Sequence, residues 1–88
     1  MEDLKDIRSE IDKIDDELAR LLRRRLEIVD RVAKVKRERG LPVLDPRREK
    51  EIVTRVSAKV GPGFSSEISQ LFSTIFGISR TRQTAVSG

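Results

Sequence analysis

Between Leu4 and Arg39 the aliphatic residues recur at alternating spacings of three and four. The positions that follow this rule are Leu4, Ile7, Ile11, Ile14, Leu18, Leu21, Ile28, Val32 and Val35. Such an a/d heptad pattern predicts one long amphipathic helix whose apolar stripe needs a partner along its whole length. The pattern therefore favours an all-α fold. Arg25 interrupts the stripe, and a guanidinium in an aliphatic seam is costly unless an anion meets it.

The composition agrees with long helices and restricts the chemistry. Charged residues make up 39% of the 88 residues and aromatic residues only 3%, which leaves little for a β-sandwich or barrel to pack. The chain has no Cys and no His, so thiolate chemistry, disulfides and the commonest metal ligand are excluded. The sequence also has no apolar run of roughly 20 residues and no signal-peptide pattern. We expect one cytoplasmic domain over residues 1–88, without a metal site.

Two shorter helices are predicted after the long one. Asp45-Pro46 supplies an N-cap and a first helical residue, so a second helix is expected over about 46–59. Gly61-Pro62-Gly63 is a turn, a third helix follows over about 65–83, and residues 84–88 are expected to fray. The expected inner faces consist of Ile52, Val53, Val56 and Val60 in the second helix, and of Ile68, Leu71, Phe72, Ile75 and Phe76 in the third.

Each predicted helix also carries polar residues where its inner face should be apolar. They are Arg25 and the adjacent Lys36 in the first helix, Glu49 in the second, and Ser79 and Gln83 in the third. Buried polar groups need partners, so three helices that turn such groups inward predict a shared polar pocket. For Ser79 and Gln83 the alternative is simple exposure at the end of a helix.

The spacing along the first helix predicts more than one copy of the chain. Arg25 and Lys36 lie about 16 Å apart on nearly the same face, so they could bracket a small anion. Arg8 lies about 25 Å from Arg25, too far for one small ligand to touch both in one chain. If two copies of the long helix pair antiparallel, Arg8 of one copy comes opposite the Arg25 to Lys36 interval of the other. A short chain with a long apolar stripe favours such a homodimer.

The net charge of +4 raises the question of a nucleic-acid partner. Acidic and basic residues are interspersed along the first helix rather than segregated on one face. A nucleic-acid-binding face would segregate its charge and add a recognisable motif or aromatic residues. We therefore expect neither a nucleic-acid nor a membrane partner.

Five segments, in order and at matching separations, carry a family resemblance over nearly the whole chain. They are Ile7-Arg8-Ser9-Glu10-Ile11-Asp12 with Ile14-Asp15, Leu21-Leu22-Arg23-Arg24-Arg25, Val32-Ala33-Lys34-Val35-Lys36, Pro42 to Glu49, and Leu71-Phe72 leading to Ser79 and Gln83. The sequence resembles the all-helical family of chorismate mutases. The resemblance implies three helices per protomer in an intertwined dimer, with two active sites made from both chains.

The same resemblance implies an isomerase that converts chorismate to prephenate by a Claisen rearrangement, on the route to Phe and Tyr, without a cofactor. It assigns Arg25, and Arg8 of the second chain, to the carboxylates of the substrate. Lys36 and Gln83 fall at the positions of the donors to the ether oxygen. Such donors stabilise the negative charge that develops as the C–O bond breaks.

The remaining site positions also match in residue type. Glu49 and the backbone at Asp45 correspond to contacts with the ring hydroxyl, and Ser79 is expected near the ring carboxylate. Arg48 corresponds to a supporting position. Arg80 stands where an apolar residue of the pocket wall would be unsurprising, and the sequence offers no account of it.

Two other functions remain open at this stage. A related enzyme of similar fold eliminates pyruvate from isochorismate, and an assay with both substrates separates the two activities. A non-catalytic helical module is the other alternative, and it would leave Arg25, Glu49 and Gln83 on inner faces without a reason.

Overall fold

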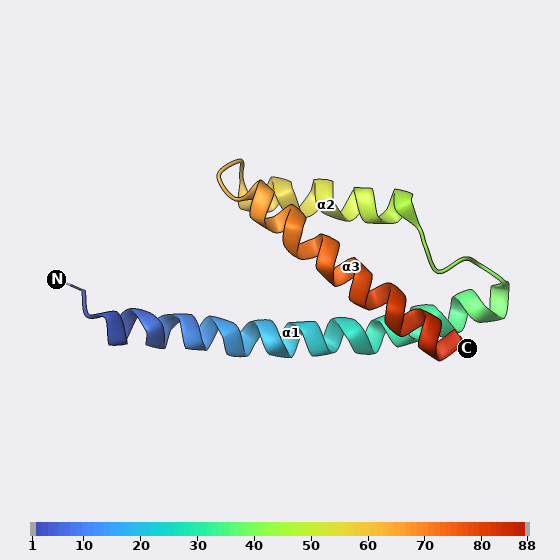
Figure 1. Ribbon diagram of the computed structural model, residues 1–88, viewed down its shortest axis with the longest axis horizontal. Helices are drawn as coiled ribbons and strands as arrows, with labels where there is room; N and C mark the ends of the chain where they lie inside the picture. The colour runs from blue at the N-terminus through green and yellow to red at the C-terminus, as the bar shows by residue number, and fades with distance from the viewer. Residues whose placement is uncertain (1, 88) are drawn as a thin grey trace.

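The computed structural model describes residues 2–87, which form three helices and no strand. The helices are α1 (Leu4–Arg39), α2 (Pro46–Val60) and α3 (Ser65–Ser87). The predicted all-helical, three-helix fold is therefore confirmed (Figure 1). Over the described part of the chain, no helix is long and apolar enough to cross a membrane.

Both ends of α1 are fixed by local hydrogen bonds. The carboxylate of Asp3 accepts a hydrogen bond of 2.9 Å from the backbone N–H of Lys5, so Asp3 is the N-cap. At the other end Gly40 has a φ of 66°, in the left-handed region. This conformation lets the N–H of Leu41 donate to the carbonyl of Lys36 at 2.8 Å and close the helix.

The ends of α2 and α3 follow the local sequence. Asp45 caps α2 by accepting a hydrogen bond of 3.1 Å from the Arg48 N–H, and Pro46 occupies the first turn. The turn before α3 is closed by a 3.2 Å hydrogen bond from the Phe64 N–H to the Gly61 carbonyl. The structure continues α3 to Ser87, past the predicted end near residue 83, because residues 84–87 contain no helix breaker. Gly88 of the segment expected to fray lies outside the described residues.

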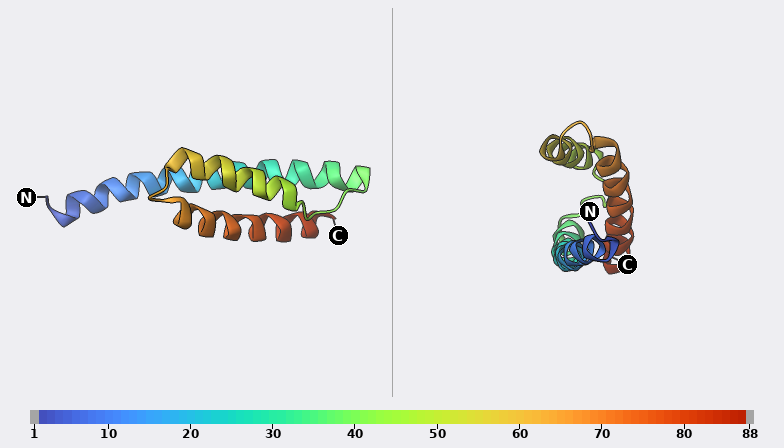
Figure 2. Two further views of the ribbon diagram at one scale, coloured as in Figure 1. Left: turned by 90° about the horizontal axis from the view of Figure 1, so that it is seen from above. Right: turned by 90° about the vertical axis from the view of Figure 1, so that its left-hand side faces the viewer.

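α3 is the element that joins the fold. It packs against both α1 and α2, whereas α1 and α2 make no close contact with each other within residues 2–87. Figure 1 shows α3 running diagonally from the end of α2 across the C-terminal half of α1. The left-hand view of Figure 2 shows the N-terminal part of α1 extending beyond the other two helices. The pocket described below lies where the three helices converge.

The chain by itself encloses a very small core. Among residues 2–85, whose burial is described, the buried apolar residues are Val29, Ala33, Ile52 and Phe76. Its radius of gyration is 16.3 Å, whereas a compact domain of this length would have about 12 Å. The heptad stripe is largely exposed, as shown by Leu18 at 46% and Leu21 at 50%.

Two details of the predicted inner faces differ from the structure. α3 packs on the face of α1 that carries Val29 and Ala33, next to the heptad stripe rather than on it. The small side chain of Ala33, which is fully buried, permits this close approach. Leu71 and Val60 were predicted to face inward, but they are 49% and 36% exposed because no other element of residues 2–87 covers them.

Candidate active site

A pocket of about 300 Å³ lies between the C-terminal half of α1, the start of α2 and the C-terminal half of α3. Its polar lining residues are Arg25, Lys36, Asp45, Arg48, Glu49, Ser79, Arg80 and Gln83, and its apolar lining residues are Ile28, Val29, Val32, Val43, Ile52 and Phe76. The structure thus brings together seven of the eight residues predicted from the sequence. Its size is at the lower end of the range for small-molecule sites.

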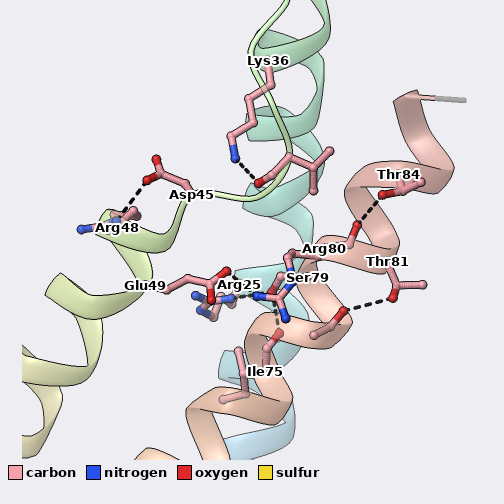
Figure 3. A network of polar contacts seen from close by, with 12 residues as sticks. Arg25, Lys36, Asp45, Arg48, Glu49, Ile75, Ser79, Arg80, Thr81 and Thr84 are labelled. Carbon is pink, nitrogen blue, oxygen red and sulfur yellow. Dashed lines mark hydrogen bonds and ion pairs between the residues drawn. The ribbon is translucent and has the colours of Figure 1, made fainter.

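Arg25 projects from α1 toward α3 (Figure 3). Its Nη1 donates a hydrogen bond of 2.8 Å to Ser79 Oγ, which in turn donates to the carbonyl of Ile75 at 2.8 Å. Burial lowers the pKa of the Arg25 guanidinium from its usual value, and the positive charge of Arg48 lowers that pKa further. A bound anion would favour the charged form of Arg25 and offset both effects.

Lys36 lies in the last turn of α1 and reaches the connection that leads to α2. Its Nζ donates a hydrogen bond of 2.8 Å to the carbonyl of Val43. An ammonium group has three donors, so this bond fixes the direction of the side chain and leaves donors for a ligand. Lys36 therefore both holds the 40–45 segment against α1 and contributes a positive charge to the pocket.

The start of α2 supplies Asp45, Arg48 and Glu49. Asp45 is used as the N-cap, so its backbone stands at the edge of the pocket. The side chain of Glu49 takes no part in the N-cap of α2, which is formed by Asp45. The Glu49 carboxylate instead accepts a hydrogen bond from Nη1 of Arg80 on α3. The Arg48 side chain lies 3.8 Å from a carboxylate oxygen of Glu51, and both side chains are exposed.

Ser79 and Gln83 come from α3, and both are buried, with 6% and 7% of their surface exposed. The alternative of exposure at the end of a helix is therefore wrong. Gln83 Oε1 is buried and accepts no hydrogen bond from any residue in the described range. A buried amide oxygen without a donor is costly. A ligand group or water in the pocket is the natural source of the missing hydrogen bond.

Arg80 is the functional candidate that the sequence pattern did not identify. It lines the pocket and forms an ion pair with Glu49 across the space between α3 and α2. Its position directly after Ser79 is the only signal in the sequence. Including Arg80, the pocket has four cationic and two anionic side chains, which favours a dianionic ligand.

Arg8 does not reach this pocket. It lies on the projecting N-terminal part of α1 and lines a shallow depression with Leu4, Lys5, Ser9 and Asp12. At 1.5 Å per residue, Arg8 is about 25 Å along the helix from Arg25. Within one chain the two arginines therefore cannot contact the same small molecule.

Comparison with known proteins adds an independent finding. The model of the family "Chorismate mutase type II" matches residues 7–84. The T-protein of Haemophilus influenzae is 57% identical over 49 residues, which are 56% of this chain and 13% of that protein. The chorismate mutase of Methanocaldococcus jannaschii is 39% identical over 56 residues, which are 64% of this chain and 57% of that protein.

A bifunctional chorismate mutase/prephenate dehydratase of Aquifex aeolicus is 43% identical over 56 residues, which are 64% of this chain and 16% of that protein. The matches thus span between 13% and 57% of the curated relatives' own lengths. A solved structure of a conserved hypothetical protein from Pyrococcus furiosus superposes with a TM-score of 0.76 at 38% identity. That match covers 91% of this chain and 93% of the other.

Proposed function

Because the chain belongs to the chorismate mutase type II family, we propose that it catalyses the rearrangement of chorismate to prephenate. The observation that carries the proposal is the convergence of Arg25, Lys36 and the buried Gln83 on one positively charged pocket. Chorismate is a small dicarboxylate, and its charge and size suit this pocket. The relatives whose names include chorismate mutase support the same activity.

The reaction breaks the ether C–O bond and forms a C–C bond within one molecule, so no atom enters or leaves. It requires no nucleophile, and the work of the protein is orientation and electrostatic stabilisation. We assign the carboxylates of the substrate to Arg25 and to Arg8 of a second copy. A guanidinium holds a carboxylate through two parallel hydrogen bonds, which favours a single substrate conformation.

We assign the ether oxygen to Lys36 and Gln83. Negative charge grows on this oxygen in the transition state, so donors aimed at it lower the barrier rather than only tighten binding. The burial of Gln83 supports this role, because hydrogen bonds gain strength where water is excluded. Lys36 retains donors beyond the one that it gives to Val43.

The remaining residues are assigned to the cyclohexadiene ring. The backbone of Asp45 and the carboxylate of Glu49 bind the ring hydroxyl, Ser79 lies beside the ring carboxylate, and Arg48 supports the site through its positive charge. The Ser79 hydroxyl donates to the Ile75 carbonyl in the structure. Since a hydroxyl rotates freely, Ser79 can redirect this donor to a carboxylate while Arg25 stays nearby.

We further propose an intertwined homodimer with two shared sites. The exposed heptad stripe of α1 is a long apolar surface, and monomeric proteins rarely leave such a surface in water. Antiparallel pairing of two α1 helices would cover this stripe and carry Arg8 of one copy to the pocket of the other. The cytoplasmic location expected from the sequence remains a prediction.

The experiment that tests the proposed function is incubation of the purified protein with chorismate. We expect chorismate to disappear at a rate proportional to protein concentration, and proton NMR to identify prephenate as the single product. Release of pyruvate would instead indicate a lyase, and unchanged chorismate would overturn the proposal. The Arg25→Ala variant, once circular dichroism has shown that it is folded, is the control for a contaminating enzyme. Its activity should fall sharply, whereas the activity of a contaminant would not change.

A further inference from the structure

The proposed function assigns no role to Arg80, although its side chain lies in the pocket. Arg80 extends from α3 and its Nη1 donates to Glu49 Oε2 on α2 (Figure 3). The two side chains are 36% and 26% exposed, so the pair is partly shielded from water. Within residues 2–87 this hydrogen bond joins the side chains of α2 and α3, and both residues line the pocket.

A carboxylate in this position creates an electrostatic difficulty. The pocket is built to hold a dianion, and a second negative group next to a bound carboxylate is repulsive. Arg80 contacts Glu49 directly and offsets its charge. With Arg80 in place, the pocket can use an anionic hydrogen-bond acceptor without repelling its ligand.

The geometry also leaves one oxygen of Glu49 available. Arg80 binds Oε2, while Oε1 has no hydrogen-bond partner in the described part of the chain. An ionised carboxylate accepts hydrogen bonds but cannot donate them. An available carboxylate oxygen, held in a fixed direction by a neighbouring guanidinium, therefore selects a hydroxyl and rejects a group without a hydrogen-bond donor.

We propose that Arg80 is a positioning residue that holds Glu49 through Oε2 and so directs Oε1 at the ring hydroxyl of the substrate. This inference rests on the proposed function. The hydroxyl lies away from the bonds that change, so its contact is made equally in the ground state and in the transition state. Loss of Arg80 should therefore raise KM more than it lowers kcat.

The test is steady-state kinetics with chorismate. For Arg80→Met we expect KM to rise roughly tenfold, the scale of one charge-assisted hydrogen bond, with kcat changed less than about twofold. Arg80→Lys keeps the positive charge, so its KM should stay close to that of wild type. If Arg80→Met does not fold, Arg80→Gln retains a neutral donor of similar length and should raise KM by an intermediate factor. Arg82→Met is the matched control, because Arg82 pairs with Asp30 outside the pocket.

Two measurements separate positioning from a merely structural role. In a Glu49→Gln background, Arg80→Met should raise KM by less than about twofold, because Glu49, the residue that Arg80 positions, has already been replaced. For an analogue of chorismate in which hydrogen replaces the ring hydroxyl, wild type and Arg80→Met should have the same KM.

Several outcomes would overturn the inference. A loss that persists undiminished in the Glu49→Gln background would show that Arg80 contacts the substrate directly or acts through the fold. An equal loss for the analogue would lead to the same conclusion. An active wild type whose Arg80 variants keep its KM overturns this inference alone, whereas a wild type that leaves chorismate unchanged overturns the proposed function as well.

Discussion

The side chain of Gln83 is buried, and its Oε1 lacks a hydrogen-bond donor in the described residues. An amide is neutral at every ordinary pH, so its N–H can serve the ether oxygen across the whole range. A carboxyl group can donate only while it is protonated. A change from amide to carboxyl at this position is therefore a direct probe of what Gln83 faces.

The Gln83→Glu variant should work best at acidic pH and lose activity as its carboxyl ionises, because a carboxylate repels the charge that forms on the ether oxygen. Burial would raise the pKa of the new carboxyl above the usual value of about 4.3, while a nearby ammonium such as Lys36 would lower it. Measuring kcat/KM against pH decides the matter. Gln70→Glu, on an exposed position of α3, is the control and should follow wild type. If kcat/KM of Gln83→Glu depended on pH in the same way as that of wild type, Gln83 would not face the ether oxygen.

At the scale of single residues, the sequence predicted the inward positions of Ser79 and Gln83 but not every partner. Ser79 and Gln83 continue the apolar stripe of α3, so helical periodicity alone places them on the buried face. Whether Arg80, one position further along, turns into the pocket depends on the location of Glu49 on another helix. That distance is set by tertiary packing, which a one-dimensional pattern does not contain.

At the scale of elements, the end of α1 depends on one backbone conformation. A Cβ on Gly40 would meet nothing within 4 Å, so only its φ of 66° opposes a side chain. Gly40→Ala should therefore destabilise the protein by about 1 kcal/mol, the cost of the left-handed region for a residue with a Cβ. Thermal unfolding followed by circular dichroism measures this effect.

Gly77 is the matched control for that change. It lies within α3, and an added Cβ there also meets nothing within 4 Å, but its φ is not positive. Gly77→Ala should raise stability by up to about 1 kcal/mol, because alanine has the higher helix propensity. Equal changes in Tm for the two variants would contradict the account of how α1 ends.

The contact between α1 and α3 includes an ion pair with a defined pH dependence. Arg82 Nε and Nη2 donate to the two carboxylate oxygens of Asp30 at 2.6 and 2.8 Å. These hydrogen bonds lower the pKa of Asp30 in the folded state. The pair therefore contributes stability above the usual aspartate pKa of about 3.9, and the contribution is lost as the pH falls through the lower folded-state pKa.

Asp30→Asn should accordingly lower Tm slightly at pH 7, and the difference in Tm from wild type should be smaller at pH 2. Thermal unfolding of both proteins at the two pH values tests this expectation. A difference in Tm that persists unchanged in acid would show that Asp30 contributes by something other than its charge.

The elements themselves could be read from the sequence because caps, glycines and periodicity are local signals. Asp45-Pro46 and Gly40 mark helix ends through the conformations that these residues prefer. The choice of packing face could not be read in the same way. Heptad periodicity identified the widest apolar face of α1, whereas α3 uses the neighbouring face at Val29 and Ala33. A small residue that permits close approach gives a weaker signal than an aliphatic stripe.

At the scale of the whole molecule, one chain is an open structure. Its extents of 58 × 25 × 15 Å, its small core and its exposed α1 stripe are unlike those of a domain that is stable alone. The sequence anticipates this property through the length of the stripe. The position of a second copy would depend on how two α1 helices pair, and the sequence pattern of one chain does not determine that pairing.

A site shared between two copies of the chain can be tested by mixing two inactive variants. Arg8→Ala and Arg25→Ala proteins are unfolded, combined in equal amounts and refolded, and chorismate turnover is measured. Random pairing makes half of the dimers mixed, and each mixed dimer keeps one site with both arginines, so about a quarter of wild-type activity should return. Each variant refolded alone should remain nearly inactive. The absence of any recovery in a sample in which mass spectrometry demonstrates mixed dimers would contradict a site built from two copies.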